Sequence, residues 1–154
     1  IQLLSLGCSG NCKMQPYFAD ALAQATDIDA FIFDSFSNPT IDEINERLFP
    51  FIERLQAAHP GKPLIFQHTI YRERRNFDLA TEKNESERMR VVDELMAEAV
   101  KRYKDVYYVT TTNATSPKHD TSVDGTHPGD HGYSLWAESI QKPILKILRK
   151  YGIR

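Results

Sequence analysis

An aspartate and a histidine stand three positions apart in the segment SVDGTHPGDHGY, residues 122–133. A carboxylate that accepts a hydrogen bond from one imidazole nitrogen fixes the tautomer of the ring and leaves the other nitrogen free to take a proton. Asp124 and His127 are therefore candidates for the orienting acid and the base of a nucleophile, histidine and acid triad. The alternative is that Asp124 only closes an Asx-type turn with Gly125, and that His127 merely precedes the last helix.

Two further residues could stabilise a developing oxyanion. Gly10 lies in the segment GCSGNCK, residues 7–13, which follows an apolar run, and its backbone N–H could face a ligand at the start of a helix. The side-chain amide of Asn38 could donate to the same oxygen. The structural alternatives are a tight strand-to-helix connection at Gly10, and a turn before Pro39 that Asn38 shapes.

The elements that must position these residues alternate along the chain. Apolar runs rich in β-branched and aromatic residues are typical of parallel strands covered on both faces, and we expect four of them. They are residues 2–6, 30–36, 63–70 and 106–111. Amphipathic patterns typical of helices lie between and after them, at residues 14–25, 40–59, from Asn84 onward, and 130–151.

Two helix starts carry capping-box pairs, Thr40 with Glu43 and Asn84 with Glu87. In the last helix the spacing of the apolar residues predicts an inward face. It consists of Leu135, Trp136, Ile140, Ile144, Leu145 and Leu148. The order of strands and helices predicts one α/β domain over residues 1–154, with a parallel sheet between two helical layers.

In such a fold, ligands bind where the strands end at their carboxyl side. The loops expected there are residues 7–13, 35–40, 71–85 and 112–130. The candidate site residues Gly10, Asn38, Asp124 and His127 all lie in these loops. In the third loop, the basic residues could line a substrate mouth or remain solvated. They are Arg72, Arg74 and Arg75.

Taken together, the segments LGCSGN, DSFSNPT and DGTHP resemble three signature blocks of the SGNH hydrolase family, also known as GDSL-type esterases or lipases. The resemblance implies a three-layer α/β/α flavodoxin-like fold. It also implies that Gly10 and Asn38 are oxyanion donors and that Asp124 and His127 are the acid and base. The third block departs from the usual Gly-x-Asn-Asp pattern, which affects the assignment of Asn38. The branch it resembles most contains bacterial carbohydrate esterases.

The family's first block, a strand that ends in the nucleophilic serine, has no counterpart in this sequence. By resemblance, that strand is the first central strand, between the strands at residues 2–6 and 30–36. We therefore expect a missing N-terminal segment of the same domain, and an isolated fragment without esterase activity. Ser9 is a poor substitute, because a nucleophile elbow needs glycine where Asn11 stands. Cys8 and Cys12 have no neighbouring base in the sequence.

Charge and composition limit the other functions. With 19 basic and 21 acidic residues the net charge is −2, which gives no electrostatic reason to expect nucleic acid as a partner. No apolar run is long enough for a membrane span, and we expect a soluble chain. The two cysteines provide no disulfide framework from which to infer the compartment, which stays open, with a bacterial periplasmic or secreted location implied only by the resemblance.

Zinc is a rival cofactor, because His127 and His131 are four residues apart and Cys8, Cys12, His68 and His119 could be recruited. However, Pro128 and Gly129 interrupt the helix that would align the first two. We expect no cofactor. The expected function is a serine esterase acting on a small-molecule ester, for which the resemblance favours carbohydrate O-acetyl groups. The alternative is a non-catalytic flavodoxin-like binding module that has lost its nucleophile.

Overall fold

Three short parallel strands form the sheet of the computed structural model, which describes residues 1–110 and 120–154. The strands are β1 at Phe31–Phe33, β2 at Leu64–Gln67 and β3 at Val106–Val109, in the order β1-β2-β3. Phe31 pairs with Leu64, and Leu64 pairs with Val106. The sheet is parallel, as predicted, although each strand is shorter than its apolar run. Residue 111, the end of the expected fourth strand, lies outside the described residues.

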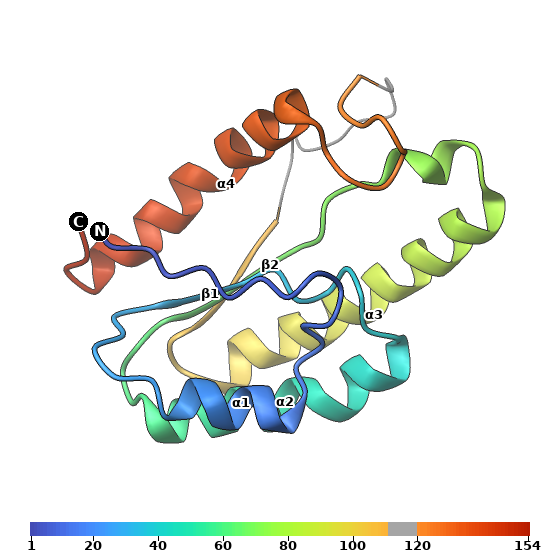
Figure 1. Cartoon of the computed structure of the whole chain (residues 1–154). Coiled ribbons are helices and arrows are strands. Elements are labelled where there is room, and N and C mark those ends of the chain that lie inside the picture. Colours follow the sequence, from blue (N-terminus) through green and yellow to red (C-terminus); the bar gives the residue numbers. More distant parts are fainter. Residues whose placement is uncertain (111–119) are drawn as a thin grey trace.

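Helices cover both faces of the sheet (Figure 1). On one face lie α1 at Pro16–Ala23, α2 at Ile41–Ala58 and α3 at Leu79–Arg102. On the other lies α4 at Asp130–Lys150. A short 3-10 helix, η1 at Glu73–Asn76, follows β2. The three-layer α/β/α architecture is therefore confirmed.

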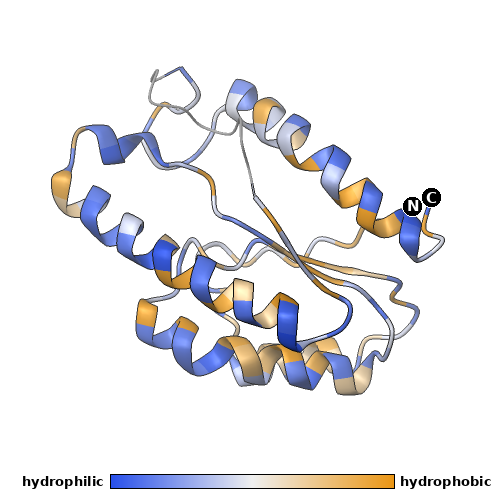
Figure 2. Ribbon diagram, turned by 180° about the vertical axis from the view of Figure 1, so that it is seen from behind, coloured by the Kyte–Doolittle hydropathy of each residue, from blue (hydrophilic) through white to orange (hydrophobic). Residues whose placement is uncertain are grey.

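Two separate cores correspond to the two faces. Phe33 and Phe66 pack against α1, α2 and α3 in the larger core, whereas Ile65 and Val109 pack against Ile144, Ile147 and Leu148 of α4 in the smaller one. Figure 2 shows mostly apolar strands between helices that alternate apolar and polar positions. Each helix is thus held by one apolar face, which leaves the loops at the strand ends to carry polar groups.

The start of α2 is as predicted, and the start of α3 is not. The Glu43 N–H donates to Thr40 Oγ1 (3.2 Å), and the Thr40 N–H donates to Glu43 Oε2 (2.8 Å). In contrast, α3 begins at residue 79, because Asp78 Oδ1 accepts from the N–H groups of Ala80 (3.0 Å) and Thr81 (3.1 Å). The expected cap at Asn84 lies inside the helix, since the carboxylate of Asp78 already satisfies the first free N–H groups.

The strand expected at residues 2–6 does not form. Residues 1–7 are exposed, and no backbone pairing of residues 1–6 is recorded among the described residues. An apolar run becomes a strand only when a neighbouring backbone supplies its hydrogen-bond partners. In the described residues β1 pairs with β2 alone, so the other edge of β1 has no strand beside it.

The inward face of α4 is shifted from the predicted one. Ile144 and Leu148 are buried as expected, and Ile147 joins them, whereas Leu135, Trp136, Ile140 and Leu145 are only half-buried. The smaller core lies against the second half of the helix, so its first half reaches beyond the sheet toward the loops. Among the described residues, no helix is long and apolar enough to cross a membrane.

Candidate functional site

Asp124 and His127 form a compact unit on one turn. His127 Nδ1 lies 2.7 Å from Asp124 Oδ2, while Asp124 Oδ1 accepts from the N–H groups of Thr126 (2.8 Å) and His127 (2.7 Å). The two readings of this segment are therefore compatible, because one carboxylate closes the turn and also holds the imidazole. The hydrogen bond from the imidazole, followed by those from the two N–H groups, lowers the pKa of Asp124 well below its usual range.

The other imidazole nitrogen of His127, Nε2, belongs to a largely exposed side chain. The side chain is 77% exposed, and within the described part of the chain no hydroxyl or thiol is hydrogen-bonded to Nε2. A neutral imidazole whose Nδ1 proton is held by a carboxylate has a free basic nitrogen at Nε2. The turn can thus present a proton acceptor to a group outside its own contacts.

The loop around this turn is closed by its own hydrogen bonds. Ser122 and Pro128 form an isolated antiparallel bridge, and Ser122 Oγ donates to the carbonyl oxygen of His127 (2.8 Å). Gly125 sits at φ +76, a left-handed conformation that glycine adopts without steric cost. The sequence signals of aspartate and glycine therefore match the local structure of the turn.

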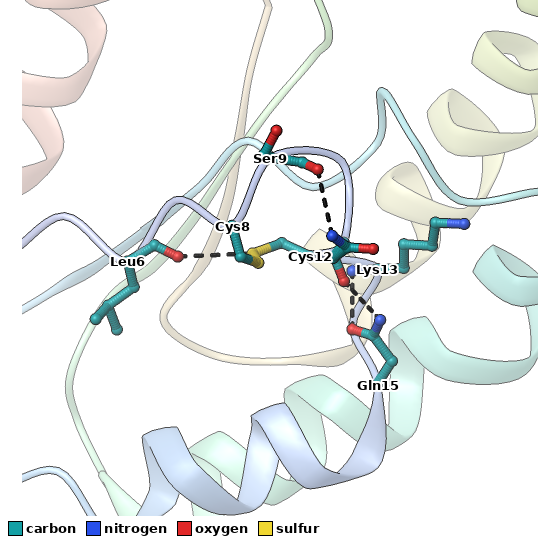
Figure 3. Close-up of a disulfide and its surroundings, with 7 residues drawn as sticks. Leu6, Cys8, Ser9, Cys12, Lys13 and Gln15 are labelled. Atoms are coloured by element: carbon teal, nitrogen blue, oxygen red, sulfur yellow. Dashed lines mark hydrogen bonds between the residues drawn. A yellow bond between two sulfur atoms is a disulfide. The ribbon is translucent and has the colours of Figure 1, made fainter.

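The segment that carries Gly10 is closed by a disulfide between Cys8 and Cys12 (Figure 3). Gly10 has φ +79, Ser9 has φ +43, and the Asn11 N–H donates to the Cys8 carbonyl (3.1 Å). This tight turn brings the two cysteine Cα atoms to 5.8 Å, a distance that a disulfide spans. The sequence analysis found no disulfide framework and did not predict this bond. Because both sulfur atoms are bonded to each other, neither is a free thiolate.

Asn38 lies next to Gly10. A Cβ atom built on Gly10 would lie 3.8 Å from Asn38 Oδ1, so the glycine backbone and the carboxamide are neighbours across 28 positions of sequence. The backbone on both sides of Asn38 is held by Arg88, whose Nη1 donates to the carbonyls of Ser37 (3.0 Å) and Pro39 (3.3 Å). The two residues predicted as oxyanion donors thus share one place in the fold.

A comparison with models of protein families shows which family the chain belongs to. The model of the GDSL-like lipase/acylhydrolase family matches residues 1–146, nearly the whole sequence. The chain belongs to this family.

One solved structure supports the same assignment. It is the crystal structure of a candidate GDSL-like lipase from Bacteroides ovatus ATCC 8483, with a TM-score of 0.82 and 33% sequence identity. The match covers 91% of this chain and 42% of that one, so the chain spans about two fifths of the length of that protein. No curated protein matches the chain.

In this GDSL-like chain, the arginines of the third loop are engaged in internal ion pairs. Arg72 Nη1 binds Glu85 Oε1 (2.8 Å), Arg75 Nε binds Glu82 Oε2 (2.6 Å), and Arg74 Nε lies 3.3 Å from Asp78 Oδ2. The hydrogen bonds from Arg75 and Ser86 lower the pKa of Glu82 to about 2. Arg72, with a side chain that is only 20% exposed, is turned into the protein. Arg74, at 60%, is the most exposed of the three.

Several buried polar residues near these loops were missed by the sequence reading. Glu73, Glu85 and Thr121 are nearly fully buried, and Arg88 is largely so. Glu85 carried a usable signal, because it stands four residues before Met89 on the buried face of α3. Glu73 and Thr121 carried none, since their contact joins residues 48 positions apart.

No group of three or more potential metal ligands is found among the residues that the structure describes. His119, one of the residues considered for zinc, lies outside the described residues. His68 follows β2, with Nδ1 2.6 Å from the carbonyl oxygen of Thr69. The two cysteines considered for zinc are bonded to each other.

Proposed function

We propose that this chain supplies the base and the oxyanion donors of a serine esterase that hydrolyses carboxylic esters through an acyl-enzyme. The observation that carries the proposal is the 2.7 Å contact between His127 Nδ1 and Asp124 Oδ2, which leaves Nε2 as the free basic nitrogen of a side chain that is 77% exposed. Membership of an acylhydrolase family gives that acceptor a reaction in which to act. The nucleophile is proposed to be a serine upstream of Ile1.

In the proposed reaction, His127 Nε2 takes the proton of the serine hydroxyl as its oxygen attacks the ester carbonyl carbon. The carbonyl oxygen becomes negative and accepts hydrogen bonds from the Gly10 N–H and the Asn38 amide. His127 then gives the proton to the leaving alcohol, and the acyl-serine forms. Water attacks the acyl-serine with His127 again as base, which releases the acid and restores the serine.

The proposed substrate is a small acyl group, such as acetyl, on a polar alcohol such as a carbohydrate. A groove of about 480 Å³ is lined in part by Asn38, and six of its eight lining residues are polar. The lining residues are Asn38, Pro39, Thr40, Ile41, Asp42, Asn84, Glu87 and Arg88. Such side chains offer hydrogen-bond partners to the hydroxyl groups of a polar alcohol.

A second candidate is a non-catalytic binding module that keeps the fold. Within the described residues no hydroxyl is bonded to His127 Nε2, and both candidates are consistent with this. The two candidates differ in the segment encoded just upstream of Ile1. A strand followed by Gly-x-Ser supports the esterase, whereas another residue at the serine position supports the binding module.

The experiment is hydrolysis of p-nitrophenyl acetate by the full-length protein, meaning the product of the whole reading frame that contains this sequence. His127→Ala should lower kcat by roughly 10³-fold or more, because the base is removed. His131→Ala is the matched control, an exposed histidine in the first turn of α4, and should retain activity. Activity that survives His127→Ala would overturn the esterase, and loss of activity on chelation would point to a metal enzyme instead.

A further inference from the structure

Two consecutive residues after β2 reach two different loops of the proposed site. The side chain of Arg72 contacts the segment that carries Asn38, and the side chain of Glu73 contacts the segment that carries His127. Arg72 is the N-cap residue of η1 and Glu73 is its first residue, so both belong to one short turn.

On the Asn38 side, the contact is to the backbone. Arg72 Nη2 donates to the carbonyl oxygen of Ser37 (3.1 Å), which directly precedes Asn38. The same oxygen accepts from Arg88 Nη1 (3.0 Å), and Glu85 holds both guanidinium groups, at 2.8 Å from Arg72 and 3.4 Å from Arg88. The side chain of Glu85 is only 6% exposed, so the loss of either arginine would leave a buried carboxylate with fewer partners, which is costly.

On the His127 side, the contact is a buried carboxyl group. Glu73 is 2% exposed, and its Oε1 accepts from the N–H of Thr121 (2.9 Å) and from the Thr121 hydroxyl. Next to it, the Arg74 N–H donates to the carbonyl oxygen of Gly125 (2.7 Å), between Asp124 and His127. A buried carboxyl group that loses such partners is costly, so the turn of η1 and the histidine loop are held together.

Thr121 is also the point where the histidine loop meets α4. Its carbonyl oxygen accepts from the Gly129 N–H (2.8 Å), and a Cβ atom on Gly132 would lie 2.5 Å from that oxygen. Through Thr121, Glu73 therefore holds the loop and the first turn of α4 at once.

We propose that Arg72 and Glu73 together form a positioning element that sets the Asn38 donor and the His127 base relative to each other. The proposal rests on the esterase function proposed above. The Asp124–His127 unit is built by local hydrogen bonds, which fix the imidazole on its own turn but not the direction in which the turn faces. The side chain of His127 is 77% exposed, so few packing contacts of its own fix its direction. Its direction therefore depends on the contacts that hold the loop to the rest of the protein.

The test uses the full-length protein and p-nitrophenyl acetate. Glu73→Ala should lower kcat by roughly 10- to 100-fold with KM within about twofold, because a small displacement of the base impairs proton transfer more than binding. Glu73→Gln keeps an acceptor oxygen for Thr121 and should restore most of kcat. Glu82→Ala is the matched control, because Glu82 also binds η1 through Arg75 but, within the described residues, has no hydrogen bond to either loop, and it should keep kcat within about twofold.

Two further measurements separate positioning from general damage to the fold. In a His127→Ala background, Glu73→Ala should cause no further loss, and in an Asn38→Ala background, Arg72→Lys should cause none. In Glu73→Ala with His127 intact, the ¹⁵N-imidazole NMR signature of the Nδ1 hydrogen bond should persist, since Asp124 still holds the ring. An equal loss from Glu73→Ala with and without His127, or a loss matched by Glu82→Ala, would overturn the proposal.

If Glu73→Ala does not fold, Thr121→Val tests the same contact with a smaller perturbation. It keeps the shape and the N–H of residue 121 and replaces the hydroxyl that Glu73 binds with a methyl group, so kcat should fall by roughly 3- to 10-fold. Unchanged kcat in Thr121→Val would overturn the positioning role while leaving the esterase intact. Absence of hydrolysis by the unmodified protein would instead overturn the esterase, and the positioning role with it.

Discussion

Gly132→Ala probes the contact between α4 and the histidine loop most directly. The added Cβ would lie 2.5 Å from the Thr121 carbonyl oxygen and 2.9 Å from Pro128 Cβ, and the nearer of these is a backbone atom that cannot rotate away. Such overpacking costs about 1–3 kcal/mol, whereas alanine in a helix is favoured over glycine by about 1 kcal/mol. We expect a net loss of about 1 kcal/mol, or about 3 °C in Tm.

The assay is thermal unfolding of the full-length protein, followed by p-nitrophenyl acetate hydrolysis. Because the clash pushes the loop from the helix, kcat should fall along with Tm. Gly129→Ser is the matched control, since its Cβ would lie an ordinary 3.8 Å from the same oxygen and serine is a favourable N-cap. A Tm that rises in Gly132→Ala, as helix propensity alone would cause, refutes the close approach of loop and helix.

Three other changes have defined outcomes. Asp124→Asn should lower kcat and remove stability that the depressed pKa of Asp124 supplies, which is present above the unfolded pKa of about 3.9 and lost as the pH falls further, as pH-dependent melting would measure. Asp78→Ala should lower Tm by about 3 °C and Asn84→Ala should not, because the residue at 78 caps α3. Cys8→Ser or Cys12→Ser should lower the free energy of unfolding, measured in urea, by at most about 2 kcal/mol, the chain-entropy value for so short a loop. Adding a reductant to these variants should not change their stability further.

The sequence predicted the fold correctly where an element depends on residues that are neighbours in the sequence. The capping box at Thr40 and the apolar face of α2 arise from neighbouring residues, and both are present in the structure. The strand expected at residues 2–6 failed because an apolar run does not specify its partner. The cap at Asn84 failed for a different reason, since the carboxylate of Asp78 began the helix earlier and placed the capping pair inside it.

The same division holds in the candidate site. The Asp124–His127 contact was predictable, because both residues stand on one turn and the glycine between them permits it. The Cys8–Cys12 bond was within reach of the same reasoning, since two glycines near a Cys-x-x-x-Cys spacing allow a tight turn. The contact of Glu73 with Thr121 was not predictable, because no local sequence pattern links two residues that are 48 positions apart.

A buried polar contact between distant loops is costly unless its partners are placed accurately, so it constrains the fold more than an apolar contact would. Glu85 and Glu73 each place a buried carboxyl beside a loop of the proposed site, one through two arginines and the other through a threonine. Apolar cores hold the helices on the sheet but tolerate small shifts, whereas hydrogen bonds to a buried carboxyl depend on distance and angle. We therefore expect substitutions of core residues that lower Tm by the same amount to impair hydrolysis less than substitutions of Glu73 do.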